Sequence, residues 1–217
     1  MQKRNYQKEL EAIITENEKA GRRPRLLLHA CCAPCSSYVM EYLSRYFDIT
    51  MYYYNPNIDT EEEYIHRTKE LERLIHEMPL ASEVKLVVGP YEPERFYEIA
   101  RGHEKDPERG ERCMRCYELR LRESAMFTKE ANERTVSEAE RFDYFTTTLS
   151  ISPLKNAEAL NEIGMRVAAE YGVQYLPSDF KKKEGYKRSI ELSRMYALYR
   201  QDYCGCVFSK HQFVKKT

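Results

Sequence analysis

Short apolar runs alternate along the chain with longer amphipathic stretches, and this alternation predicts the secondary structure. The apolar runs predict five strands, at residues 26–30, 49–54, 84–88, 142–149 and 173–177. The amphipathic stretches predict helices at residues 6–19, 34–46, 60–77, 93–100, 113–132, 156–171 and 188–200. Strands and helices that alternate at this rhythm are typical of an α/β fold with a doubly wound, mostly parallel sheet.

Local signals define the ends of two of these helices. Thr60 is followed three residues later by Glu63, a spacing that resembles a capping box. The helix that begins there has a predicted buried face of Ile65, Leu71, Leu74 and Ile75. Gly172 ends the helix at residues 156–171.

Length and composition indicate one domain that spans residues 1–217 and carries a helical C-terminal extension. Lys plus Arg and Asp plus Glu are equal at 35 each, so bulk charge favours neither a nucleic-acid binder nor a binder of acidic ligands. No apolar run approaches the roughly 18 residues of a membrane span, and the N-terminal stretch lacks the apolar core of a signal peptide. We therefore expect a cytoplasmic protein with no membrane partner.

Seven cysteines occur in three groups, and none of them stands alone in the sequence. The groups are Cys31, Cys32 and Cys35, then Cys113 and Cys116, then Cys204 and Cys206. The cytoplasm keeps thiols reduced, so a disulfide framework is not the expected explanation. Metal binding or redox chemistry is the leading one.

The predicted topology brings several of these groups to one edge of the sheet, because ligands of open parallel sheets bind at the carboxyl ends of the strands. Cys31, Cys32 and Cys35 follow the first strand directly. The run Thr146, Thr147 and Thr148 closes the fourth strand, and Asp179 follows the fifth. Cys113 and Cys116 begin a helix after the third strand, which is compatible with the same edge.

The number of thiols indicates two metal centres. Helix N-termini lower the pKa of a thiol, and thiolates are the ligands that iron and zinc require. Four thiolates suffice for a [4Fe-4S] cluster, and the remaining three would hold a mononuclear iron or zinc. Three alternatives remain open: a Cys32 and Cys35 redox pair, a Cys204 and Cys206 dithiol, or a single zinc bound by four thiolates.

Other polar residues give weaker signals. His29 lies inside the first strand, where a satisfied core histidine and a proton-transfer group are both possible. The basic run Lys181, Lys182 and Lys183, with Arg188, is either a solvated face or a phosphate-contacting patch. Eighteen tyrosines supply aromatic rings for stacking on unpaired bases, although most belong to the core.

Four motifs carry a resemblance to a known family. They are "LLLHACCAPCSSYV", "CMRCYELRL", "DYFTTTLSISPLKN" and "DFKKKEGYKRSIELSRMYALYRQDYCGCVFS". In this order they closely resemble the cobalamin-independent epoxyqueuosine reductase family of the QueH type, from about residue 24 to residue 209. The resemblance implies reductive removal of the epoxide oxygen from epoxyqueuosine at the wobble position of a tRNA anticodon loop. It also implies an iron-sulfur cluster with a nearby metal, and a fold similar to the adenine-nucleotide α-hydrolase (HUP) group.

One departure from the nucleotide hydrolases bears on the chemistry. Those proteins place a Gly-rich SGGxDS loop after the first strand, whereas this chain has "HACCAPCSS". Without the glycines the backbone cannot easily wrap a pyrophosphate, so the site is expected to bind metal in place of ATP. Two further hypotheses are an ATP-dependent iron-sulfur tRNA sulfurtransferase and a non-catalytic RNA-binding module with structural zinc.

The resulting hypothesis assigns a role to each candidate residue. The [4Fe-4S] cluster is expected on Cys31, Cys32, Cys113 and Cys116, and the second metal, iron or zinc, on Cys35, Cys204 and Cys206. Candidate proton donors are His29, Asp179 and Tyr203. Candidate tRNA contacts are Lys181, Lys182, Lys183 and Arg188. An external electron donor, similar to a ferredoxin or a flavodoxin, completes the expected partners.

Overall fold

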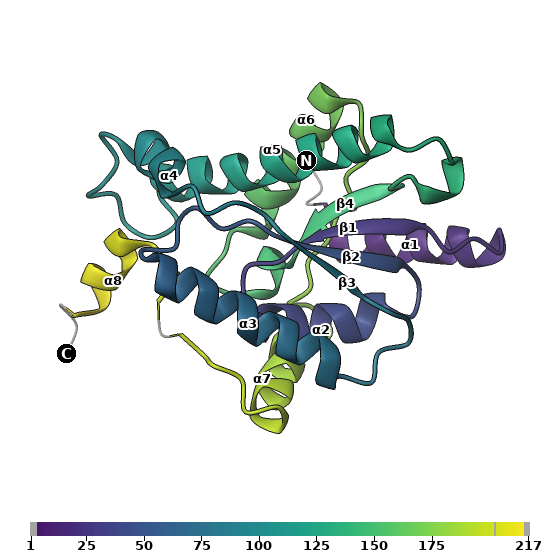
Figure 1. Ribbon diagram of the computed structural model, residues 1–217, viewed down its shortest axis with the longest axis horizontal. Helices are drawn as coiled ribbons and strands as arrows, with labels where there is room; N and C mark the ends of the chain where they lie inside the picture. Colours follow the sequence, from purple (N-terminus) through teal and green to yellow (C-terminus); the bar gives the residue numbers. More distant parts are fainter. Residues whose placement is uncertain (1–3, 202, 215–217) are drawn as a thin grey trace.

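A computed structural model describes residues 4–201 and 203–214 and contains a four-stranded parallel sheet (Figure 1). The strands are β1 (Arg25–His29), β2 (Asp48–Tyr53), β3 (Lys85–Val88) and β4 (Tyr144–Thr147). Their order in the sheet is β3-β2-β1-β4, and every neighbouring pair is parallel. The α/β class and the parallel sheet are therefore confirmed.

The fifth predicted strand is wrong, because residues 173–177 form only an isolated bridge between Tyr175 and Phe145 of β4. A longer parallel ladder would next use the carbonyl of Leu176 and the N–H of Ser178. Side chains bind both groups instead: the hydroxyl of Thr146 donates to Leu176 O at 2.8 Å, and Ser178 N donates to Asn161 Oδ1 at 2.9 Å. These competing hydrogen bonds end the ladder after one bridge.

Helices cover both faces of the sheet, because successive side chains of β1 point to opposite sides. Leu26 and Leu28 lie in one buried core, and Leu27 lies in the other. The first core is built with α1 (Tyr6–Lys19), α2 (Ala33–Leu43), α3 (Glu61–Glu77) and α7 (Gly185–Met195). The second is built with α5 (Glu111–Arg134) and α6 (Ala157–Tyr171), which lie on the other side of the sheet in Figure 1.

The remaining elements are short. They are α4 (Pro93–Ala100), the 3₁₀ helices η1 (Glu138–Glu140) and η2 (Thr148–Ile151), and α8 (Val207–Val214). A third, smaller core consists of Phe96, Ala100, Cys116 and Cys206, and Phe208 of α8 packs against it, so that this core joins α4, α5 and α8. This contact attaches the predicted C-terminal helical extension to the N-terminal end of α5.

The predicted helices form with shifts of up to five residues at their ends, the largest in the helix predicted at residues 188–200, where α7 ends at Met195. The helix α3 shows one error in the predicted buried face. Thr60 caps α3 by accepting a hydrogen bond from Glu63 N at 3.2 Å. Tyr64, Arg67, Leu71 and Leu74 form the buried face, whereas Ile65 is 44% exposed. Ile65 comes one residue after the buried Tyr64, and one residue turns a helix by about 100°, so the side chain of Ile65 points away from the buried face. The prediction that Ile65 is buried is therefore wrong.

The strand order places the switch point of the sheet between β1 and β4, because the chain adds β2 and β3 on one side of β1 and β4 on the other. Ligands of such sheets bind at the carboxyl ends of the two strands that flank the switch point. The segments there are residues 30–35 after β1 and η2 after β4. Among the helices in residues 4–201 and 203–214, none combines the length and apolar character needed to cross a membrane.

Candidate metal and active site

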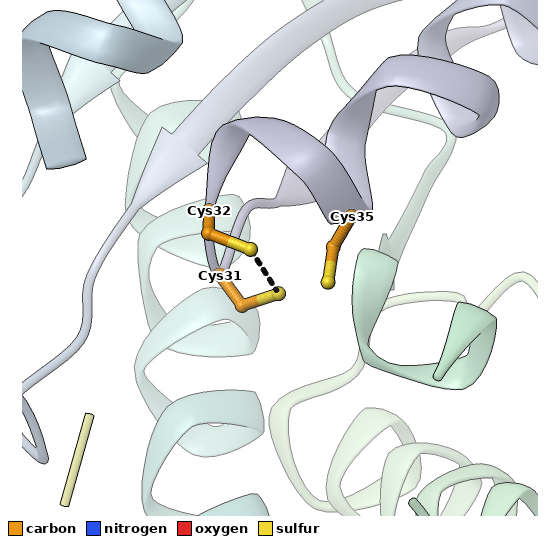
Figure 2. Close-up of side chains that lie close together, drawn as sticks. All are labelled: Cys31, Cys32 and Cys35. Carbon is orange, nitrogen blue, oxygen red and sulfur yellow. Dashed lines mark hydrogen bonds between the residues drawn. The ribbon is translucent and has the colours of Figure 1, made fainter. Parts of the chain in front are cut away.

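Three thiols lie together where β1 ends and α2 begins (Figure 2). Cys32 is the N-cap residue of α2 in an extended conformation, and Pro34 occupies the first turn, where a missing N–H costs no hydrogen bond. The sulfurs of Cys31, Cys32 and Cys35, here called the thiol trio, all lie within 4.8 Å of one another. The trio is therefore placed to bind a metal.

The spacing within the trio matches thiolates that share one metal ion. The Sγ atoms of Cys31 and Cys32 are 3.8 Å apart. Metal–sulfur bonds of about 2.3 Å in tetrahedral geometry separate two thiolates by about 3.8 Å. Hydrogen bonds from Cys31 and Cys35 hold the pKa of Cys32 well below its ordinary value, so Cys32 is the thiol that ionises most readily.

The switch point also contributes Thr148, the first residue of η2. Its hydroxyl accepts a hydrogen bond from Cys31 N at 3.2 Å and donates to Cys31 Sγ at 3.4 Å. Because β1 and β4 are neighbours, a residue that follows β4 fixes the orientation of a thiol that follows β1. The order of the strands thus brings Thr148 next to Cys31, although the two residues are 117 positions apart in the sequence.

The other four thiols line a separate small cavity of about 20 Å³. Cys113 and Cys116 come from the first turns of α5, and Cys204 and Cys206 come from the tail that precedes α8. These four are called the thiol quartet below. Burial raises the pKa of Cys113, Cys116 and Cys206, that of Cys116 to about 12, so these three thiols keep their protons at neutral pH when no metal is bound. Among the described residues, no three quartet thiols meet the 4.8 Å spacing that the trio shows.

The structure thus groups the cysteines differently from the predicted division. The prediction combined Cys31 and Cys32 with Cys113 and Cys116, whereas the structure keeps the trio together and places Cys113 and Cys116 with the tail cysteines. The difference arises from the path of the tail. The carbonyl of Gly205 accepts a hydrogen bond from Asp59 N at 2.9 Å, which holds the Cys-Gly-Cys segment beside the start of α3.

A buried cation lies between the two thiol groups. Arg120 on α5 is 2% exposed and lines both cavities. Its guanidinium donates to Asn55 Oδ1, and its Nε lies 3.3 Å from His29 Nε2, a nitrogen that is also 3.0 Å from the carbonyl of Tyr54. Burial disfavours the charged form of Arg120, but the negative charge that Cys116, Cys31 and Cys204 carry as thiolates raises the pKa of Arg120 above its ordinary value. Arg120 therefore supplies a positive charge to both groups.

Two further cations line the quartet cavity. Arg112 is 1% exposed and donates to the carbonyls of His103, Glu104 and Asp106, while its Nε and Nη2 have no partner among the described residues. Lys155 donates to the Sγ of Cys204 at 3.0 Å and pairs with Glu108 at 3.0 Å. The quartet cavity is thus lined by three cations, one of which is paired with Glu108, and by N–H groups of Arg112 that have no hydrogen-bond partner among the described residues.

A larger cavity of about 210 Å³ adjoins the quartet cavity. Its lining includes the trio, and it shares Asn57, Glu108, Arg120, Lys155 and Cys204 with the quartet cavity. All seven cysteines therefore surround two adjoining cavities at the switch point of the sheet. Tyr186 and Ser189 of α7 also line the larger cavity, so the N-terminal half of α7 borders it.

The three candidate proton donors lie in different surroundings. Tyr203 lines the larger cavity, with the Arg67 guanidinium 5.4 Å from its ring centroid. His29 lies beneath the cavity: it is fully buried, and its Nδ1 is 2.8 Å from the hydroxyl of Thr147. Burial and the Arg120 charge lower the pKa of His29 to about 3, so its ring is neutral. Asp179 pairs with Lys181 and is absent from the cavity lining.

The candidate tRNA contacts lie at the start of α7, and most of them form ion pairs. Lys181 pairs with Asp179, Lys183 with Glu11, and Arg188 with Glu41 and Glu191. Lys182 is exposed, and no ion pair is found for it among the described residues. Its ammonium group is therefore the most available cation of the basic run.

Sequence reasoning missed several polar residues of the site. They are Asn55, Asn57, Arg67, Arg112, Arg120, Lys155 and Gln201. Asn55 and Asn57 had a usable signal, because "NPN" ends the second strand at the same edge of the sheet. The arginines had none, since a helical arginine usually belongs to a solvated face.

Comparison with known proteins identifies the relatives of this chain. The family model described as "Epoxyqueuosine reductase QueH" matches residues 26–212. The protein of that name from Staphylococcus epidermidis is 45% identical over 212 residues, covering 96% of this chain and 85% of the relative. Those from Staphylococcus aureus and Thermotoga maritima are 43% and 32% identical, covering 97% and 85% of this chain and 86% and 89% of the relative.

Proposed function

The chain belongs to the epoxyqueuosine reductase QueH family, and on this premise we propose that its two thiol groups hold the metal centres of an oxidoreductase that acts on tRNA. The family match replaces the two other hypotheses drawn from the sequence, the sulfurtransferase and the zinc RNA-binding module. One observation carries the proposal: all seven cysteines surround two adjoining cavities at the switch point of the sheet.

The chemistry of the reaction fixes how many electrons and protons it consumes. Conversion of the epoxide of epoxyqueuosine to an alkene breaks two carbon–oxygen bonds, consumes two electrons and two protons, and releases one water molecule. The electrons come from an external donor, for which we keep the expectation of a ferredoxin- or flavodoxin-like protein. The chain must therefore hold redox centres, bind the epoxide beside them and provide protons.

We assign the mononuclear metal, iron or zinc, to the trio of Cys31, Cys32 and Cys35. Their mutual spacing fits one ion, and the trio lines the larger cavity, so a small molecule in that cavity has access to it. Three thiolates leave one position of a tetrahedral site for another ligand. This assignment revises the division expected from the sequence.

We assign the [4Fe-4S] cluster to the quartet of Cys113, Cys116, Cys204 and Cys206. Four thiolates are the ligand set of such a cluster, and its thiolates lie farther apart than those of one ion because each binds a different iron. The unpaired N–H groups of Arg112 suit sulfur acceptors, and the charges of Arg120 and Lys155 offset the negative charge of four thiolates. When bound, the cluster supplies electrons one at a time.

A single ion on the quartet is the alternative, and one observation favours it. The quartet cavity measures about 20 Å³, which is close to the space that one water molecule needs. A single metal ion bound by four thiolates would also carry negative charge, and this charge would be offset by the same cations, Arg112, Arg120 and Lys155. Iron stoichiometry separates the two possibilities, because a cluster contributes four irons and an ion contributes one.

The residues of the chain have three further roles in the proposal. Burial raises the pKa of Tyr203, so its hydroxyl keeps its proton at neutral pH and donates it toward substrate oxygen in the larger cavity. His29 acts indirectly by orienting Arg120. Asp179 orients Lys181, and Lys181, Lys182, Lys183 and Arg188 contact phosphates of the anticodon stem-loop beside the cavity.

Metal analysis of anaerobically purified protein tests this proposal. We expect about five irons per chain, or about four irons and one zinc, with a broad absorbance near roughly 400 nm. Cys113→Ala should remove the absorbance, whereas Cys31→Ala should keep it and remove one metal. A colourless protein with one zinc would contradict the cluster, and loss of the absorbance only in Cys31→Ala would reverse the two assignments.

A further inference from the structure

Three residues of the larger cavity carry buried polar atoms that lack a hydrogen-bond partner within the described part of the chain. These atoms are Nη2 of Arg67, Oδ1 of Asn57 and Oε1 of Gln201. Natural proteins contain few such atoms, because a buried polar group without a partner costs stability. Their common position at one cavity indicates that a polar ligand satisfies them.

The guanidinium of Arg67 is fixed by an ion pair through Nε, and its Nη2 has no hydrogen-bond partner among the described residues. Its Nε pairs with Glu63 at 2.7 Å, and only 2% of its side chain is exposed. Its guanidinium lies over the ring of Tyr203, and its Nη1 packs against Gly205, where an added Cβ would be 3.0 Å away. Glu63 occupies Nε, and Nη2 is the buried nitrogen of this guanidinium that has no hydrogen-bond partner in the described part of the chain, so Nη2 is available to a ligand.

The two amides present acceptors next to the thiols. Asn57 donates its Nδ2 to the carbonyl of Cys204 at 3.4 Å, which leaves Oδ1 as a free acceptor. Gln201 lies three residues before Cys204 and lines the same cavity as Cys32. The cavity thus offers one cationic donor and two neutral acceptors beside the metal-binding residues.

The size of the cavity limits which part of the substrate can bind next to these three atoms. Its volume, about 210 Å³, is below the roughly 300–1,000 Å³ of pockets for drug-sized ligands. It therefore accommodates a single small ring rather than a whole nucleoside. In epoxyqueuosine the epoxide lies on a cyclopentane ring that also carries two hydroxyl groups, and a hydroxyl both donates and accepts hydrogen bonds.

We propose that Arg67, Asn57 and Gln201 bind the hydroxylated cyclopentane ring and so determine the specificity of the enzyme for its substrate. The inference rests on the reductase function proposed above. The hydroxyl groups donate to Oδ1 of Asn57 and Oε1 of Gln201 and accept from Nη2 of Arg67. Binding the ring by its hydroxyls leaves the epoxide available to the thiol-bound metal.

Two nucleosides that differ by the ring provide the test. One is queuosine, the reaction product, which keeps both hydroxyls, and the other is 7-aminomethyl-7-deazaguanosine, which has the same base and no ring. Calorimetry with the metal-loaded wild-type enzyme should show tighter binding of queuosine by about tenfold or more, because a site built for hydroxyl groups discriminates against a ligand that lacks them. Arg67→Met and Gln201→Met should each remove most of this preference.

A control on the same helix and a conservative variant keep the result interpretable. Lys69→Met, which removes an exposed cation of α3, should retain the preference. Gln201→Met nearly preserves side-chain shape, so it decides the question if Arg67→Met fails to fold. Metal content and KM for epoxyqueuosine tRNA are measured on the same samples, and KM should rise while metal content stays constant.

The outcomes separate this inference from the function on which it rests. A wild-type enzyme that reduces the epoxide, with variants that keep the full preference for queuosine, would overturn the inference alone. A loss of metal in Gln201→Met together with the loss of binding would also overturn it, because the residue would then support the metal site. A wild-type enzyme that does not reduce the epoxide would overturn both.

Discussion

The ammonium group of Lys155 lies 3.0 Å from the Sγ of Cys204, and this contact joins the segment after β4 to the C-terminal tail. Only 8% of the Lys155 side chain is exposed, and the thiol of Cys204 raises its pKa well above the ordinary value against the effect of burial. A hydrogen bond from a charged donor in such surroundings is stronger than one between neutral groups. Lys155 therefore places a charged donor on the sulfur of Cys204, and we propose that this contact supports metal binding there.

Replacing this cation should weaken metal binding by the quartet. Lys155→Met removes the charge and leaves Glu108 with one cationic partner fewer, so we expect faster loss of iron to a chelator under anaerobic conditions. Lys155→Arg should restore part of the retention. Lys129→Met, which removes an exposed lysine on the same side of the sheet, is the control. Equal rates of iron loss in all three variants would show that Lys155 does not support the site.

The sequence pattern predicted the parts of the fold that depend on local periodicity. The four strands of the sheet and the helix at residues 6–19 are examples, and the position of the trio followed from the rule for parallel sheets. The fifth strand failed because the Thr146 and Asn161 side chains compete for its backbone groups. Such competition depends on residues far away in the sequence and leaves no periodic signal.

The grouping of the thiols could not be predicted for a related reason. Spacing indicates which cysteines share a helical turn, as Cys113 and Cys116 do, but it carries no information on where a tail folds back. The hydrogen bond between Asp59 N and Gly205 O helps to hold Cys204 and Cys206 beside the first turns of α5, where Cys204 also borders the cavity of the trio. It joins residues almost 150 positions apart in the chain.

Gly205 should resist substitution for two separate reasons. Its φ of +100° is a conformation that favours glycine, and an added Cβ would lie 3.0 Å from Nη1 of Arg67. We expect Gly205→Ala to lower the free energy of unfolding by about 1–3 kcal/mol and to reduce metal binding by the quartet. Urea unfolding and metal analysis measure the two effects.

Gly102 provides the matched control for the strain alone. Its φ is +80°, and no atom outside its immediate neighbours lies within 4 Å of an added Cβ. Gly102→Ala should therefore cost stability by a similar strain without changing the metal content. If both variants keep full metal content, the tail tolerates displacement and the contact with Arg67 is not needed.

Lys182 should contribute to tRNA binding more than its two neighbours. Lys181 and Lys183 are engaged by Asp179 and Glu11, whereas Lys182 is exposed without an ion pair in the described structure. We expect Lys182→Glu to weaken binding of the tRNA and to reduce the slope of log affinity against log salt by about 1. Filter binding at several salt concentrations measures both.

The control for this charge reversal is Lys129→Glu, on the helix that covers the opposite face of the sheet. It changes the net charge by the same amount, so a long-range effect of charge would appear in both variants. An unchanged salt dependence in Lys182→Glu would exclude the start of α7 from the tRNA-binding surface.

Glu70 connects α3 to the segment that leads to the tail cysteines. Its carboxylate accepts a hydrogen bond from Tyr199 N at 2.7 Å and pairs with Arg73 at 2.8 Å, with 13% of its side chain exposed. The hydrogen bond from Arg73, aided by the one from Tyr199 N, holds the pKa of Glu70 below its ordinary value of 4.5. Glu70 therefore binds the segment after α7 most strongly in its ionised form.

The stability that Glu70 contributes should disappear in acid. A carboxyl group with a lower pKa in the folded state stabilises that state above its unfolded pKa, and the contribution is lost as the pH falls through the folded pKa. We expect Glu70→Gln to be less stable than the wild type by about 1 kcal/mol at neutral pH, with the difference closing below about pH 4. Amide hydrogen exchange should accelerate at Tyr199 in the variant at neutral pH, because the neutral amide accepts that hydrogen bond more weakly. A stability difference that stays constant down to about pH 3 would mean that the charge of Glu70 does not hold this segment.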